Sequence, residues 1–222
     1  MNISKKNREI ALYGLFIAIE LMVGLTPLGY IPTPLLTITT VHLPVIIAAI
    51  VMGPKMGGVL GGVFGLTSLI NATFLRPNPI ESPIFSPFYG FMFNDAKLTG
   101  NVWSLVICFV PRILVGLVAA GVFAGLYALL KKVMKKDMAA ILISSGIAGV
   151  LGSLTNTILV LGGIYLFFGE PYSAAYGMDL NGLFAAIISI ISLNGIIEAV
   201  LAGFLAVVIC KPLIKVKTRM GF

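Results

Sequence analysis

The sequence has 222 residues, of which 59% are hydrophobic and only 10% are charged, and its mean hydropathy is +1.07. Soluble domains carry about 25% charged residues, so this composition excludes a soluble domain and predicts an integral membrane protein surrounded by lipid. The two cysteines, Cys108 and Cys210, lie in apolar stretches without metal-ligand spacing. We expect them to be free, buried thiols, and no metal or cofactor is expected.

Six apolar stretches follow one another along the chain, and they leave no room for a soluble catalytic or nucleotide-binding domain. Crossing ~30 Å of hydrocarbon takes roughly 20 helical residues, so the second stretch is short and the last three are long. The predicted fold class is therefore an all-α integral membrane protein, a single domain over residues 1–222 with six transmembrane helices. We predict spans at 10–28, 41–53, 56–75, 102–130, 138–168 and 181–210, with outer loops at 29–40, 76–101 and 169–180.

The basic residues are distributed unevenly, and together with the acidic residues they leave a net charge of +7. Twelve of the 15 Lys and Arg residues lie at the two termini or in the connections after the second and fourth spans. The opposite loops hold only Arg76 and Lys97, and Arg112 lies within the fourth span. Because cytoplasmic loops are enriched in Lys and Arg, we predict a multi-pass protein of the cell membrane with both termini cytoplasmic. A nucleic-acid partner is not expected.

Two of the predicted outer loops have unusual compositions. The first combines prolines with threonines, Thr40 among them, and ends at His42, which we place at the outer rim of the bundle. The second, 76–101, is rich in proline and aromatic residues, including Tyr89. A loop of that length and composition is either a lid over a binding site or an interfacial aromatic belt.

Arg112 lies near the middle of the fourth predicted span, with no other charge between Lys97 and Lys131. A guanidinium at bilayer depth costs at least ~2.5–3.5 kcal/mol, so it must face a protein interior, a cavity or an anionic partner. It either binds an anionic ligand or forms a structural ion pair with Glu20 or Glu198.

Small residues are frequent in the first and third spans. The third is rich in glycine between residues 57 and 65, and Gly14 and Ala18 of the first span have the same four-residue spacing, with Ala11 nearby. Such residues let helix backbones approach closely, which explains most of these glycines without a ligand.

Together these features resemble the substrate-binding S components of energy-coupling factor (ECF) vitamin transporters. The resemblance is carried by the six spans and by residues 37–47, 53–57, 61–68 and 110–116, and the chain is most similar to the pantothenate-type members. It implies a protein that captures a vitamin on the outside and associates with a transmembrane scaffold subunit and two ATP-binding cassette ATPases. It further implies that Ala11, Gly14 and Ala18 dock on the scaffold and that the two outer loops close over the ligand.

The resemblance also suggests a binding site for pantothenate, which has one carboxylate, two hydroxyls and an amide. Arg112 supplies a cation, and asparagine side chains supply donors and acceptors. The candidate substrate-binding residues are Arg112, Asn71, Asn156, Asn194, His42, Thr40, Tyr89 and Trp103. The asparagines are equally explained by interhelical hydrogen bonds, and Tyr89 and Trp103 by anchoring at the membrane interface.

Other functions are considered beside this one. The same scaffold with a pyridoxine-, hydroxymethylpyrimidine- or cobalamin-like vitamin would leave Arg112 a structural residue. A self-sufficient secondary transporter needs a proton relay, for which only Glu20 and Glu198 are available within the spans. An enzyme is not expected, because the chain has a single histidine and lacks the His-Glu-x-x-His and Gly-x-Ser-x-Gly motifs. It also lacks a Gly-x4-Gly-Lys-Ser/Thr loop, so ATP chemistry belongs to partners.

Overall fold

A computed structural model describes residues 5–32, 37–93 and 96–219, and in these residues the chain is mainly helical. The helices are α1 (Lys5–Leu25), α2 (His42–Met52), α3 (Pro54–Ile70), α4 (Ser82–Phe85), α5 (Val102–Val133), α6 (Asp137–Ala175), α7 (Leu180–Ile190) and α8 (Ile196–Arg219). Two π-helical turns, η2 (Asn71–Leu75) and η3 (Ile191–Gly195), extend α3 and join α7 to α8. A short 3₁₀ turn, η1 (Pro27–Gly29), follows α1.

Four helical stretches are long and apolar enough to cross a membrane, namely Pro54–Leu75, Val102–Val133, Asp137–Ala175 and Leu180–Thr218. The helix His42–Met52 is apolar but shorter. Each predicted span overlaps one of these helices or α1. The expected loop from residue 169 is wrong in its first part, because α6 continues through Pro171 to Ala175. Phe168, Ser173 and Ala175 are buried there, and this packing outweighs the hydrogen bond that the proline removes.

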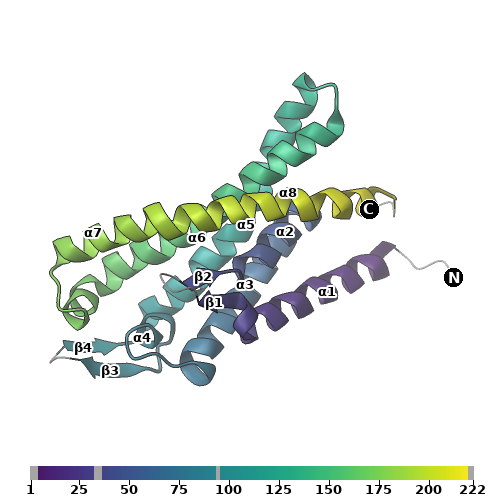
Figure 1. The fold of residues 1–222 in the computed structure, drawn as a ribbon. Coiled ribbons are helices and arrows are strands. Elements are labelled where there is room, and N and C mark those ends of the chain that lie inside the picture. Colours follow the sequence, from purple (N-terminus) through teal and green to yellow (C-terminus); the bar gives the residue numbers. More distant parts are fainter. Residues whose placement is uncertain (1–4, 33–36, 94–95, 220–222) are drawn as a thin grey trace.

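The outer loops contain strands, which the all-α expectation missed. Strands β1 (Tyr30–Pro32) and β2 (Thr37–Thr39) form one antiparallel hairpin, with Ile31 opposite Ile38. Strands β3 (Gly90–Phe93) and β4 (Ala96–Thr99) form a second, with Phe91 opposite Leu98. Figure 1 shows β3 and β4 at one end of the molecule, whereas β1 and β2 lie closer to its middle, among the helices.

Glycines hold α3 directly against the backbone of α5. A Cβ atom on Gly57 would lie 2.7 Å from the carbonyl oxygen of Gly116, and one on Gly61 would lie 2.3 Å from that of Arg112. A Cβ on Gly65 would lie 2.6 Å from the ring of Phe109. This confirms the interpretation of the third span, whose glycines allow close helix packing. Cys108 and Cys210 are free and buried, as predicted, and the Cys108 thiol donates to the carbonyl oxygen of Gly65.

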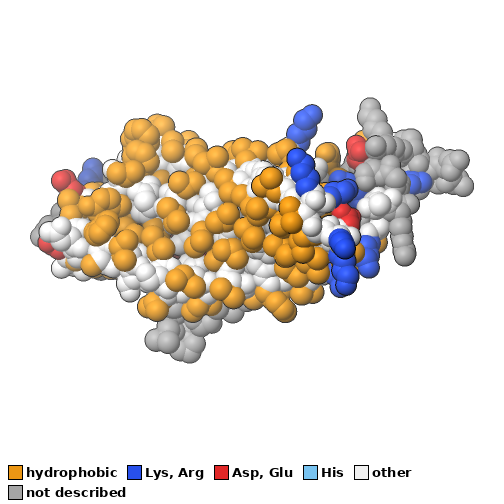
Figure 2. All heavy atoms as spheres, turned by 90° about the horizontal axis from the view of Figure 1, so that it is seen from above, with side chains coloured by type: hydrophobic (Ala, Val, Ile, Leu, Met, Phe, Trp, Pro, Cys, Tyr) orange, Lys and Arg blue, Asp and Glu red, His pale blue; other side chains and the backbone are white. Residues whose placement is uncertain are grey.

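The surface matches a protein that sits in lipid. Figure 2 shows hydrophobic side chains along the body of the molecule, with Lys and Arg gathered at the end where both termini lie. Helix α2 lies inside this body and is buried along nearly all its length, as expected for a helix that is apolar on every side. Lys217 of α8 donates to the carbonyl oxygen of Val51 at the end of α2, 2.7 Å away.

Candidate functional site

Contacts between neighbouring helices set the relative depth of the predicted site residues. A Cβ on Gly152 of α6 would touch Ile46 of α2 and Ala119 of α5, so these three residues lie at one level. His42 is one turn, ~6 Å, outward from Ile46, and Asn156 is one turn outward from Gly152. His42 and Asn156 therefore lie at similar depth, near the middle of α6.

His42 is buried between helices, and its expected position at the outer rim stays a prediction. Helix α2 has 11 residues, or about 16 Å, so the first outer loop enters the bundle before α2 begins. His42 is 1% exposed, and neither ring nitrogen has a hydrogen-bond partner among the described residues.

The guanidinium of Arg112 is held by its own helix. Pro111 has no N–H group and cannot bond to the carbonyl of Ile107, four residues earlier. Nη1 of Arg112 donates to that carbonyl oxygen instead, at 2.6 Å. The Cα of Arg112 is ~15 Å from the start of α5. The bond to Ile107 brings the guanidinium back to the level of Ile107, which is only ~7 Å from the start of α5. The Pro-Arg pair therefore directs a buried cation toward the Val102 end of α5.

Two phenylalanine rings flank the same guanidinium. Its central carbon lies 5.2 Å from the ring centroid of Phe64 in α3 and 5.0 Å from that of Phe85 in α4. Both distances are within the ~6 Å range of cation–π attraction. Arg112 itself is only 6% exposed. Because α4 belongs to the second outer loop, the arginine joins the helical bundle to a loop that the sequence predicts to be a lid or an interfacial belt.

Helix α4 is fixed to the ends of the membrane helices. Ser104, near the start of α5, donates to the carbonyl oxygen of Pro83 at 2.6 Å. The hydroxyls of Thr73, in η2, and Ser86 are hydrogen-bonded to each other at 2.8 Å. Gly100 packs so closely that a Cβ there would lie 1.9 Å from the carbonyl oxygen of Ser86. This part of the loop is therefore a packed cap above Arg112.

The three predicted asparagines all have a side-chain oxygen without a partner. Nδ2 of Asn71, in η2, donates to the carbonyl oxygen of Gly24 in α1. Oδ1 of Asn71, of Asn156 and of Asn194 is buried, and none has a hydrogen-bond partner among the described residues. Gly195, which follows Asn194, packs against Thr157, which follows Asn156, because a Cβ on Gly195 would lie 3.2 Å from the Thr157 side chain. Asn71 lies farther out, at the outer end of α3.

The two membrane-embedded acids have different surroundings. Both carboxyl oxygens of Glu20 are buried, and neither has a hydrogen-bond partner in the described part of the chain. Oε1 of Glu198 accepts two hydrogen bonds from Thr39 of β2. The structural ion pair of Arg112 with Glu20 or Glu198 therefore stays a prediction.

The remaining predicted substrate residues lie elsewhere. The hydroxyl of Thr40 donates to the carbonyl oxygen of Leu28 at 2.7 Å, closing the base of the first hairpin. Trp103 is 48% exposed and stacks on Phe167 with ring centroids 4.1 Å apart, which favours the interfacial anchor. Tyr89 is half-buried in the second outer loop, where its carbonyl oxygen accepts from the N–H of Gly100.

The predicted docking residues share one open face of α1. Ala11, Gly14 and Ala18 are exposed, and a Cβ on Gly14 would have no atom within 4 Å. Leu15 and Met22 beside them are also more than half exposed.

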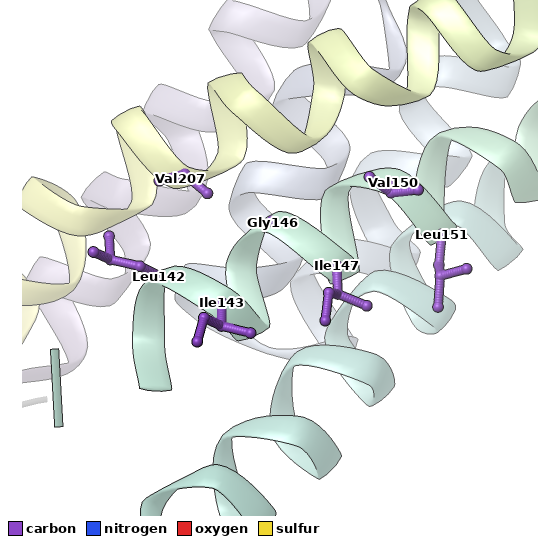
Figure 3. Close-up of a pocket in the computed structure, with 7 residues that line it drawn as sticks. All are labelled: Leu142, Ile143, Gly146, Ile147, Val150, Leu151 and Val207. Atoms are coloured by element: carbon purple, nitrogen blue, oxygen red, sulfur yellow. The ribbon is translucent and has the colours of Figure 1, made fainter. Parts of the chain in front are cut away.

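Two hollows in the surface do not involve the predicted substrate residues. The larger, of about 470 Å³, lies between α6 and α8 and is shown in Figure 3. Its lining is wholly apolar and consists of Leu142, Ile143, Gly146, Ile147, Val150, Leu151 and Val207. The smaller, of about 170 Å³, lies between α6 and α7. An anionic ligand needs polar partners that the larger hollow lacks.

Sequence reasoning missed three residues of the Arg112 region. Phe64 lies in the glycine-rich third span and Phe85 in the aromatic loop, but the sequence singles out neither of them, nor Ile107. One signal was available for Ile107, because a proline inside a helix always frees the carbonyl four residues earlier. The pairing of Phe64 with Phe85 had no sequence signal, since it depends on how the second loop folds over α3.

Comparison with known proteins agrees with this architecture. Residues 8–210 match the family model described as "ECF transporter, substrate-specific component". The chain is 34% identical over 199 residues to the pantothenic acid transporter PanT of Lactococcus lactis subsp. cremoris, covering 88% of this chain and 90% of that protein. It is 29% identical over 224 residues to the pantothenate transporter PanT of Leuconostoc mesenteroides subsp. mesenteroides, covering 98% of each. The chain is an integral membrane protein and belongs to the substrate-specific components of ECF transporters, which are transporter subunits and not enzymes.

Proposed function

We propose that this S component captures pantothenate on the outside of the cell and delivers it to the cytoplasm with an ATP-driven partner complex. The observation that carries the proposal is the outward-directed guanidinium of Arg112, buried beneath the cap formed by α4. The names of two full-length relatives support the same vitamin. The gathering of Lys and Arg at one end supports six spans with both termini cytoplasmic.

The chemistry of the region suits pantothenate. Arg112 is the partner for its carboxylate, because a guanidinium donates in a bidentate geometry. The partnerless oxygens of Asn156 and Asn194 are acceptors for its hydroxyls and amide N–H. Phe64 supplies an apolar wall for the dimethyl unit. Asn71, at the outer end, is an acceptor on the entry path.

Calorimetry of the purified chain with a panel of vitamins tests the substrate. We expect tight binding of pantothenate, and tight binding of a vitamin without a carboxylate in its place would contradict the proposal. Arg112→Gln should weaken pantothenate binding by roughly 2–5 kcal/mol, because a desolvated carboxylate loses its cation. Arg76→Gln, at an exposed position of the outer loop, is the matched control and should bind normally. Normal affinity of Arg112→Gln, with a lowered Tm, would make the arginine purely structural.

We infer that the exposed face of α1 around Gly14 docks on the transmembrane scaffold subunit, which two ATP-binding cassette ATPases drive. Gly14→Leu fills open space without disturbing the fold, so pantothenate should still bind while co-purification with the scaffold and uptake into liposomes are lost. Gly162→Leu, also in open space but on α6, is the control and should assemble normally. Uptake by this chain alone, without ATPases, would refute the proposed mechanism.

A further inference from the structure

A single carboxyl group of α8 holds the first outer hairpin. Glu198 is 7% exposed, and its Oε1 accepts the backbone N–H of Thr39 at 2.7 Å and the hydroxyl of Thr39 at 2.9 Å. Thr39 is the last residue of β2 and lies 159 residues away in the sequence. The N–H and the hydroxyl of Thr39 therefore both donate to the same carboxyl oxygen of Glu198.

The neighbouring threonine, Thr40, holds the two strands of the hairpin together. The N–H of Thr40 donates to the carbonyl oxygen of Gly29, and its hydroxyl donates to that of Leu28. These bonds keep β1 beside β2, but they do not join the pair to the helical bundle. The bonds from Thr39 to Glu198 do, because Glu198 belongs to α8.

The position of this contact places it at the base of the proposed ligand region. Thr39 is three residues before His42, which lies at the level of Asn156 in α6, and Figure 1 shows β2 among the helices. On α8, Glu198 comes just after the π-helical turn η3 that carries Asn194. π-Helical turns are rare in proteins, and those that occur are often found at functional sites. The carboxyl group thus anchors the hairpin about one turn below a candidate ligand-binding asparagine.

We propose that Glu198 is a positioning residue that keeps the β1–β2 hairpin closed and thereby sets how slowly bound ligand leaves. The proposal rests on the proposed function, with the first outer loop closing over the ligand as the family resemblance implies. Release requires the hairpin to move away from α8, and both hydrogen bonds to Glu198 must then break. Glu198 acts through Thr39 and does not contact the ligand.

Conservative and disruptive substitutions separate this role from a general effect on stability. Thr39→Val keeps the shape and the N–H but loses the hydroxyl donor, whereas Thr39→Ser keeps both donors. Glu198→Leu removes the acceptor, whereas Glu198→Gln keeps an acceptor oxygen. The rate is measured by displacing bound radiolabelled pantothenate from the purified chain with unlabelled pantothenate.

We expect Thr39→Val to release pantothenate about 10-fold faster, the effect of losing one hydrogen bond to a carboxylate. Glu198→Leu, which removes the acceptor of both bonds, should release it at least as fast. Thr39→Ser and Glu198→Gln should stay close to the unmodified protein. In the double variant, Thr39→Val should add little to Glu198→Leu, because Glu198→Leu already removes the acceptor of the threonine hydroxyl. Unchanged release from Thr39→Val and Glu198→Leu, with only Tm lowered, would overturn the proposal. Thr39→Val keeps the test valid where Glu198→Leu fails to fold.

The rate of amide hydrogen exchange in residues 37–41 reports on the contact between Thr39 and Glu198 in the ligand-free protein. Thr39→Val and Glu198→Leu should accelerate exchange in this segment, and Glu198→Gln should not. Failure of the unmodified protein to bind pantothenate would refute the proposed substrate alone. Unchanged exchange in both disruptive variants would refute the role of Glu198, whichever vitamin binds.

Discussion

Replacing Gly61 with alanine tests how Arg112 is positioned. The added Cβ would lie 2.3 Å from the carbonyl oxygen of Arg112 and 2.6 Å from the Cα of Ile113. Ordinary contacts between such atoms are about 3.5–4.0 Å, so α3 and α5 must separate by roughly 1 Å at this point. Neither obstacle is the flexible end of a side chain, and the strain cannot be relieved by a rotamer change.

The expected cost follows from two opposing terms. Overpacking of this kind costs about 1–3 kcal/mol, and the better helix propensity of alanine returns up to about 1 kcal/mol. We therefore expect Gly61→Ala to lose about 1–2 kcal/mol of unfolding free energy. Gly62→Ala gains the same propensity, but its Cβ would have no atom within 4 Å. The neighbouring substitution should be neutral or slightly stabilising.

Thermal unfolding in detergent, followed by far-UV circular dichroism, compares the two variants directly. Gly61→Ala should melt at a lower temperature than Gly62→Ala, and it should also bind pantothenate more weakly because α5 carries Arg112. Equal Tm values for the two variants would refute the reasoning, since the close approach of α3 to α5 would then have no energetic consequence.

Three further substitutions test separate contacts. Ser104→Ala should destabilise the cap by about 1–2 kcal/mol, because the hydroxyl bonds Pro83 and also caps α5; unchanged protease resistance of the second outer loop would contradict this. Trp103→Ala should leave pantothenate affinity unchanged in calorimetry, since the ring stacks on the surface; a large loss would return it to the site. Lys217→Met should lower Tm by removing the bond to Val51, at a cost of about 1 kcal/mol; an unchanged Tm would show that this bond adds no stability.

Some elements were predictable because their signals are local. The start of α5 at Val102 follows from Asn101 and Ser104, which form a capping box before an apolar run. The glycines of α3 indicated close helix packing through their spacing alone. In contrast, the continuation of α6 through Pro171 depended on the burial of Phe168 and its neighbours, which no local rule contains.

The candidate site was predictable only in its composition. Arg112 and the asparagines are conspicuous because polar groups are costly in lipid. Their arrangement was not predictable. The sequence gives the position of each polar residue along its own helix, but it does not give how far neighbouring helices are shifted relative to one another. The burial of His42 is an example, because a loop that packs among the helices has the same sequence as one that stays outside.

The sequence by itself determined that this chain lies in a membrane, where its helices run and which polar groups must be accommodated. Those conclusions depend on hydropathy and charge, which can be added up over residues that are neighbours in the sequence. The tertiary structure decided the burial of His42, the cap of Phe85 over Arg112, and the link between Thr39 and Glu198. Each of these joins segments far apart in the chain, and their register depends on which side chains fit together across helices.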